Sequence, residues 1–294
     1  MGDDDQLAER FETHRSHMRA VAYRMLGSLS EADDAVQETW LRLSRSDTSG
    51  VENLAGWLTR VVARVCLDML RSRRSRREEP LGLQASEPIV SSTDGIDPER
   101  EALLADSVGL ALLVVVDRLA PAERVAFVLH DLFAVPFDEV APIVERSPTA
   151  AKKLASRARH RVQGTATIPD ADLIRHRHVV DAFLAATRGG DMNALLAVLH
   201  PDVVRRADRA ALPAGAATEL RGARAVAEGT RVYSQLARFA RPALVNGTVG
   251  IVVVSRGRLR LVLSLTIKDD KIAEIDVIAD PWRLHQVDLA VLVN

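Results

Sequence analysis

The amino-acid sequence predicts a multidomain protein in which two all-α helical modules precede an α+β unit built on a curved antiparallel sheet. Its 294 residues, 47% of them hydrophobic, are enough to bury more than one core. Apolar residues recur at spacings of three and four through the first half, whereas the last third contains segments typical of strands. These patterns predict helical modules at 7–78 and 99–163, a linker at 79–98 and an α+β unit at 172–294.

The composition excludes several classes of protein. A net charge of −1 argues against a protein that coats DNA indiscriminately, because nonspecific phosphate binding needs a surplus of cations. No run approaches the roughly 18 apolar residues of a membrane span, and the single Cys66 suits a reducing compartment and a place in a core. We therefore expect a cytoplasmic protein without a membrane partner. Positive charge is concentrated in two islands, with five arginines at 71–77 and six Lys or Arg at 146–161.

The first module reads as three amphipathic helices. Two of them lie between Leu7 and Ser44, on either side of a break at 27–30, and Ser30 with the acids that follow it is typical of a helix start. A polar loop at 44–52 precedes a third helix, which carries its apolar stripe from Leu54 to Met69 and runs into the first arginine island.

The outward face of this third helix is basic, and the aromatic Trp57 lies beside it. Cations can hold phosphates while an aromatic receives an unstacked base, so this pattern suits single-stranded DNA. Trp57 also lies on the apolar stripe, and a core position for it stays open. Thr59 and Asp68 are expected on the same outward face. The candidate residues are Trp57, Arg60, Arg64, Arg71, Arg73 and Arg74.

The second helix of this module projects an acidic and polar stripe at steps of three and four. Such a stripe can face water or a basic protein partner, and the spacing alone does not decide between them. Its members are Asp34, Gln37, Glu38 and Arg42.

The second module has the layout of a helix-turn-helix between Phe137 and Val162. The turn is expected at 145–146, with Ser147 capping the second helix. Pro142 inside the preceding helix predicts that this helix is kinked or very short. The polar face of the second helix can enter a major groove, where Lys and Arg donate to base edges and phosphates, although a solvated basic helix is the alternative. This face consists of Thr149, Lys152, Lys153, Ser156, Arg157 and Arg159.

In the last third, the sequence pattern changes from helices alone to helices followed by strands. A helix from Leu173 to Thr187, a glycine turn at 189–190 and a short helix from Met192 to Leu199 precede the predicted strands. Hairpin turns are expected at 256–257 and 269–270. The strands are expected at 243–245, 249–255, 259–267 and 272–278, with the helices on one face of the sheet.

These motifs resemble a known family. Residues 32–42 (Ala-Asp-Asp-Ala-Val-Gln-Glu-Thr-Trp-Leu-Arg), 56–58 (Gly-Trp-Leu) and 67–71 (Leu-Asp-Met-Leu-Arg) resemble region 2 of sigma-70 factors of the extracytoplasmic-function type, and 137–162 resembles their region 4. The resemblance implies two partners, RNA polymerase core and promoter DNA. It places the contact with the clamp helices of the largest polymerase subunit on Asp34, Gln37, Glu38 and Arg42. It also assigns −10 melting and capture to 44–74, and −35 recognition to the helix from Ser147.

The α+β unit resembles the SnoaL-like branch of the NTF2-like fold, a cone, at 179–187, 190–191 and 195–204. Together the resemblances point to the sigma-J-like branch, in which the fused domain takes the place of a separate anti-sigma factor. The chain departs from that branch at the linker (84–88), at the loop 208–212 and at the tail 280–284. The regulatory positions that the resemblance implies are Asp208, Asp280, Pro281, Trp282 and Leu284.

Two other readings stay open. A cone can hold an enzyme or a ligand sensor, and Asp208, His200 and Asp202 are the nearest candidates for proton transfer. The sequence contains no metal-ligand spacing, nucleophile elbow or phosphate-binding glycine loop, so we assign no catalytic residue and expect no metal or cofactor. A small unknown ligand in the α+β unit is left open. The second reading is a DNA-binding regulator that acts without polymerase.

Overall fold

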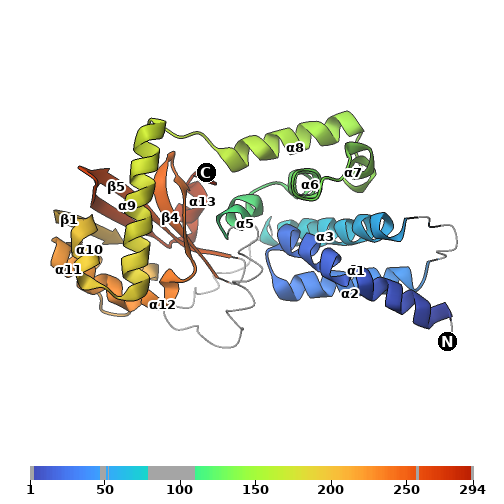
Figure 1. Cartoon of the computed structure of the whole chain (residues 1–294), viewed down its shortest axis with the longest axis horizontal. Helices are drawn as coiled ribbons and strands as arrows, with labels where there is room; N and C mark the ends of the chain where they lie inside the picture. Colours follow the sequence, from blue (N-terminus) through green and yellow to red (C-terminus); the bar gives the residue numbers. More distant parts are fainter. Residues whose placement is uncertain (1–2, 47–50, 52, 79–109, 256–257, 293–294) are drawn as a thin grey trace. The chain divides into compact units, whose positions relative to one another are not determined.

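The computed structural model describes residues 3–46, 51, 53–78, 110–255 and 258–292, drawn in colour in Figure 1. The described chain forms two compact units. The first contains residues up to 78 and 116–161, and the second contains 110–115 and 162–292. The predicted linker, the 256–257 turn and most of the 44–52 loop lie outside the described residues.

The first unit begins with three helices, α1 (Asp3–Leu26), α2 (Leu29–Leu43) and α3 (Leu54–Glu78), which pack on one another. Their apolar stripes meet in a core that contains Phe11, Met18 and Leu58. Cys66 lies in this core as expected, and burial raises the pKa of its thiol. The expected start of the second helix at Ser30 is wrong by two residues. The N-cap is Ser28, and the Ser30 hydroxyl instead lies 3.1 Å from the Ser28 hydroxyl.

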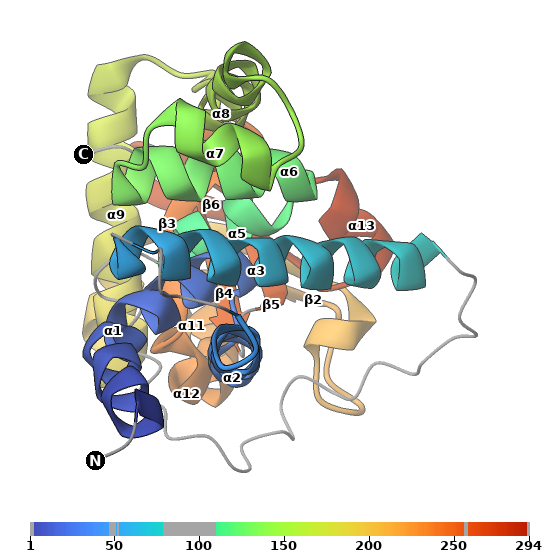
Figure 2. The same cartoon turned by 90° about the vertical axis from the view of Figure 1, so that its right-hand side faces the viewer.

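The rest of the first unit is also helical. It contains the end of α5 (Leu110–Asp117), α6 (Pro121–Phe127), a π-helical turn η1 (Val128–Leu132), α7 (Phe137–Ile143) and most of α8 (Pro148–Gln163). Helix α7 contains Pro142 and spans only seven residues, so the prediction of a very short helix is confirmed. Helices α6 and α7 pack along α3 (Figure 2). The buried Arg124 ties these parts together, donating to the carbonyls of Val116 at 2.8 Å and Met25 at 2.7 Å.

The second unit is an α+β fold, as predicted. Helix α9 (Asp170–Gly189) ends at Gly190, whose φ of 65° is the left-handed conformation that glycine adopts without strain. Asp191 then caps α10 (Met192–Val198) by accepting a hydrogen bond from the Ala194 amide at 3.0 Å. Two further helices, α11 (Ala223–Thr230) and α12 (Ser234–Ala237), and a helix near the end, α13 (Pro281–Gln286), complete the helical part.

Seven described strands form one sheet in the order β2-β1-β6-β5-β4-β3-β7. The hairpin strands run antiparallel as expected, and Asp269 and Asp270 form the β5–β6 turn with positive φ values of 49° and 56°. Strand β1, which the sequence analysis did not anticipate, lies parallel to β6, so the sheet is mixed. The strands are β1 (Leu199–Ala207), β2 (Glu219–Arg221), β3 (Ala240–Val245), β4 (Thr248–Ser255), β5 (Arg258–Lys268), β6 (Lys271–Ile278) and β7 (Leu289–Ala290).

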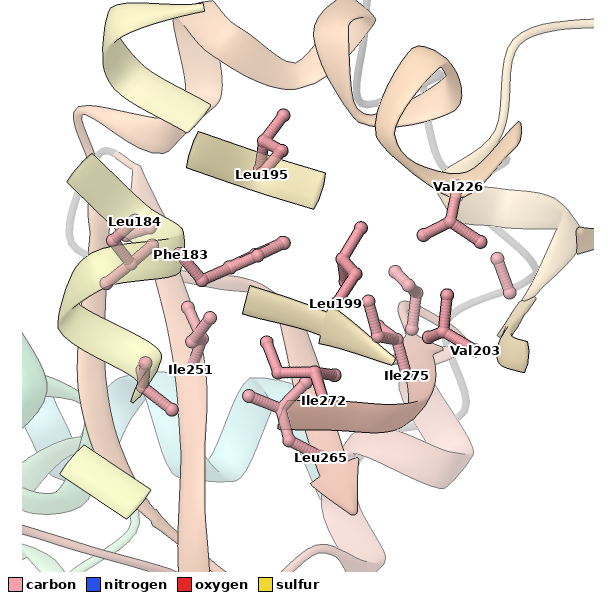
Figure 3. Packing of buried hydrophobic residues seen from close by; sticks show 14 of the residues in the cluster. Phe183, Leu184, Leu195, Leu199, Val203, Val226, Ile251, Leu265, Ile272 and Ile275 are labelled. Carbon is pink, nitrogen blue, oxygen red and sulfur yellow. The ribbon is translucent and has the colours of Figure 1, made fainter. Parts of the chain in front are cut away.

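The core of the second unit lies between one face of this sheet and helices α9, α10 and α11 (Figure 3). Phe183 of α9, Leu195 of α10 and the strand residues Ile251 and Ile272 belong to this cluster, and all four are buried. None of the described helices is both long and apolar enough to cross a membrane.

Candidate nucleic-acid and polymerase interfaces

Helix α8 presents the polar face that its sequence predicts. Ser147 caps it, because its hydroxyl accepts a hydrogen bond from the Ala150 amide at 3.2 Å. Ala151, Ala155 and Ala158 are buried against the rest of the unit. The opposite side carries the predicted DNA-binding residues, all exposed except the half-buried Arg159: Thr149, Lys152, Lys153, Ser156, Arg157 and Arg159.

The arginines farther along α8 are already engaged by carboxylates of the same unit. The Arg159 Nε donates to Asp131 at 2.8 Å. Arg157 and Arg161 lie 3.2 and 2.7 Å from the two oxygens of the buried Glu123. These pairs orient the guanidinium groups along the outer side of the helix, and they also reduce the net positive charge that this side offers to phosphates.

The basic edge of α3 is held by the turn that precedes α8. Glu145 in that turn has a φ of 58° and forms ion pairs with both Arg64 and Arg71, the second at 3.0 Å. Arg64 also donates to the Ile143 carbonyl at 2.9 Å. The hydrogen bonds from Arg64 and then Arg71 hold the pKa of the Glu145 carboxyl below its ordinary value. Two of the six residues predicted for −10 recognition therefore pair with Glu145, in the turn between α7 and α8.

The remaining residues of the α3 set have separate environments. Arg60 and Arg74 are exposed, whereas Arg73 forms an ion pair with Glu31 of α2. Trp57 is half-buried, which leaves both of its readings open. The expected outward position of Thr59 is wrong: the residue is buried, and its hydroxyl donates to the Ala55 carbonyl of the preceding turn at 2.8 Å.

The stripe predicted to contact polymerase lies along one side of α2. Asp34 and Gln37 are exposed, and Glu38 and Arg42 are half-buried and paired with each other at 3.0 Å. Ala32, Ala35 and Val36 on the other side are buried, so packing fixes which residues the helix presents outward. The result is a surface of mixed charge on which Asp34 and Gln37 are exposed.

In the second unit, the residues predicted to be regulatory partly converge. The Asp208 carboxylate accepts hydrogen bonds from the amides of Ala279 and Asp280, each at 2.9 Å, and pairs with Arg283. Burial by itself raises the pKa of Asp208, but these three hydrogen bonds together hold it below its ordinary value. Asp280 caps α13, on which Pro281, Trp282 and Leu284 follow, and the Trp282 side chain is exposed.

The candidates for proton transfer do not form a catalytic arrangement in the described residues. Asp208 is committed to the network just described, and the His200 Nδ1 accepts a hydrogen bond from the Asp202 amide at 3.2 Å on exposed backbone. Within the described chain, no group of three or more His, Cys, Asp or Glu is placed to hold a metal ion.

Sequence reasoning missed the acidic partners of the basic residues. Glu145 was read only as part of a turn, and Glu123, Asp131 and Arg283 were not singled out. No local signal marks such pairs, because Glu145 and Arg64 are 81 residues apart. The only available hint was that each basic island lacks acids of its own, so any neutralising carboxylate has to come from elsewhere.

Comparisons with known proteins identify the family. Residues 10–76 match the family described as Sigma-70 region 2, and residues 109–162 match Sigma-70, region 4. The ECF RNA polymerase sigma factor SigJ of Mycobacterium tuberculosis is 37% identical over 287 residues, which cover 92% of this chain and 91% of that protein. The chain belongs to the extracytoplasmic-function sigma factors. A second relative, the probable sigma factor SigI of the same species, is 33% identical and covers 97% of both chains.

The crystal structure of the Mycobacterium tuberculosis sigma factor SigJ is also similar. It shares 35% sequence identity with this sigma factor, covers 95% of this chain and 98% of its own, and superposes with a TM-score of 0.47. As a member of the family, this sigma factor binds RNA polymerase core and promoter DNA and directs the recognition of promoters.

Proposed function

We propose that this sigma factor contacts the polymerase clamp through α2, reads the −35 element with α8 and captures the −10 strand along α3. The observation that carries the proposal is the outer face of α8, where Lys152 and Lys153 are exposed at the start of a capped helix whose other side is buried. Side chains at the start of such a helix reach base edges in the major groove, and those farther along reach phosphates.

The polymerase contact has a direct test in charge reversal on α2. Asp34→Lys should abolish copurification of the full chain with polymerase core, because Asp34 is exposed on the proposed contact surface. Glu9→Lys is the matched control, since Glu9 is exposed on α1 outside that surface. Equal retention of core by both variants would refute the role assigned to α2.

The pairing of Glu145 with Arg64 and Arg71 adds a conformational requirement to the proposal. If these arginines hold the phosphates of the −10 strand, Glu145 has to release them first, since one guanidinium edge cannot bind a carboxylate and a phosphate together. We therefore interpret the described arrangement as a resting state. Binding to core and promoter would then favour the state in which the turn before α8 has left α3.

The second unit is proposed to regulate this equilibrium in the cytoplasm, without a separate anti-sigma factor and without catalysis. Truncation after Thr167 removes the whole sheet and the helices from α9 onward, and should change the amount of promoter-dependent transcript made with core. Unchanged transcript levels would refute the regulatory role proposed for the second unit. Turnover of a small molecule by the full chain would instead favour the enzyme alternative, although Asp208 and His200 are already engaged by backbone amides, which argues against it.

A further inference from the structure

The second unit contains an apolar cavity between α9, the helices that follow β2, and the sheet. Its volume is about 70 Å³, and its walls come from Phe183 and Leu184 of α9 and from side chains of β4, β5 and β6 such as Ile251 and Leu263. The half-buried Thr230, Tyr233 and Leu236 lie on the side formed by α11 and α12. Almost all of its lining is hydrocarbon, which would exclude a metal ion or a strongly hydrated solute.

One charged side chain interrupts this apolar lining. Arg205 of β1 lines the cavity and is only 7% exposed. One of its terminal nitrogens donates to the Ala217 carbonyl at 2.9 Å, but its Nε is buried and has no hydrogen-bond partner among the described residues. A buried donor without a partner costs free energy, and more so when it belongs to a charged group.

The hydroxyl protons of the lining are already donated to backbone carbonyls. Tyr233 donates its hydroxyl proton to the Ala211 carbonyl at 3.0 Å, and burial raises the pKa of this phenol, which keeps the proton in place. Thr187 and Thr230 donate to carbonyls one turn back in their own helices, each at 2.8 Å. Arg205 also interacts with the Tyr233 hydroxyl, so what stays without a partner among the described polar groups of the lining is its Nε, which calls for an acceptor that carries negative charge.

We propose that this cavity is a binding site for a small apolar carboxylate, with the Arg205 guanidinium as the anchor for the acid group and the α9 and sheet side chains around a short hydrocarbon body. A charged acceptor would satisfy the Nε and neutralise a buried cation in the same contact. The volume is well below the roughly 300 Å³ of typical drug-sized pockets, so a short branched acid fits the site better than a polycyclic ligand. This site is independent of promoter recognition and does not rest on it.

Arg206, the next residue of the same strand, provides a matched control. Successive side chains of a strand point to opposite faces, and Arg206 is exposed and lies 3.2 Å from Glu219 instead of lining the apolar cavity. Replacing either arginine with methionine removes one charge from β1 while retaining a long side chain.

The test is calorimetric titration of the full chain with isovalerate and with isovaleramide, its neutral counterpart of nearly equal shape. Isovalerate should bind saturably and about tenfold or more tighter than the amide, as expected for a hydrogen bond to a charged group. Arg205→Met should lose this preference, and Arg206→Met should keep it.

A second measurement covers the case in which Arg205→Met does not fold. In wild-type protein, the NMR signal of the Arg205 Nε–H should shift on addition of isovalerate and stay in place on addition of isovaleramide. The proposal is overturned if isovalerate does not bind saturably, if the amide binds equally well, or if Arg206→Met abolishes the preference as Arg205→Met does.

Discussion

Arg159 offers a quantitative test of how α8 binds DNA. It lies directly before the last turn of the helix, and its Nε donates a hydrogen bond to the Asp131 carboxylate at 2.8 Å. If Arg159 neutralises one backbone phosphate, Arg159→Gln makes the slope of log affinity against log salt less negative by about 0.9. The affinity deficit of this variant at 50 mM salt should then shrink about 3.5-fold at 200 mM salt.

Substitution of the carboxylate partner should have the opposite effect on promoter affinity. Asp131→Asn removes the carboxylate that competes with the phosphate for Arg159, whose side chain is 43% exposed. Solvent-accessible ion pairs contribute about 0.2–1 kcal/mol, so promoter affinity should rise by roughly 1.4- to 5-fold. If the Asp131 carboxylate instead orients Arg159 for DNA binding, Asp131→Asn would lower promoter affinity.

Both variants are measured as holoenzyme by fluorescence anisotropy on a promoter duplex at several salt concentrations. Arg161→Gln is the matched control, because Arg161 lies in the last turn of α8 and pairs with Glu123. An unchanged slope in Arg159→Gln would show that Arg159 does not contact a phosphate, and the same change in Arg161→Gln would show that the effect is not specific to Arg159.

Further predictions concern the internal contacts of each unit. Since the folded pKa of Glu145 is depressed, its contact with Arg64 should be intact above the ordinary value of 4.5 and be lost as pH falls through the lowered pKa. Pulsed EPR distances between α3 and α7 should lengthen there, and also at neutral pH in Glu145→Gln but not in Asp138→Asn. Arg124→Met should lower the free energy of unfolding of the first unit by about 3–5 kcal/mol, because it leaves buried carbonyls and a carboxylate without their partner; a loss under about 1 kcal/mol in urea would contradict this. Asp208→Asn should cost the second unit about 1.5–3 kcal/mol near neutral pH, the value of its charge-assisted hydrogen bonds. The difference in free energy of unfolding between Asp208→Asn and wild type should become smaller as pH falls through the lowered pKa of Asp208. A difference that does not change with pH would exclude the Asp208 carboxylate as its cause.

Local periodicity was sufficient to predict most of the helical part. The buried alanines of α8 recur at three and four residues, so its outward face followed from the sequence, as did the cap at Ser147. The misplaced cap of α2 shows the limit of this reasoning. Ser28 and Ser30 both precede acids, and only the backbone geometry at Ser28, with φ −130° and ψ 131°, decides between them.

Contacts between segments far apart in the sequence could not be predicted from local residue patterns. Strand β1 was missed because its residues include His200, Asp202 and two arginines, which obscure the alternation that normally marks a half-buried strand. Burial of Arg205 depends on β1 lying beside β6, a parallel pairing between segments about 70 residues apart. The contact between Glu145 and α3 likewise depends on how two helical modules pack, which hydrophobic spacing within each module does not specify.

Run-off transcription tests the central claim most directly. The purified full chain is added to RNA polymerase core with genomic fragments as templates, and the transcripts are mapped. The account predicts discrete transcripts that begin at defined promoters, that require the chain, and that disappear with Asp34→Lys. Core that makes no promoter-dependent transcript with either the full chain or the chain ending at Thr167 would contradict it.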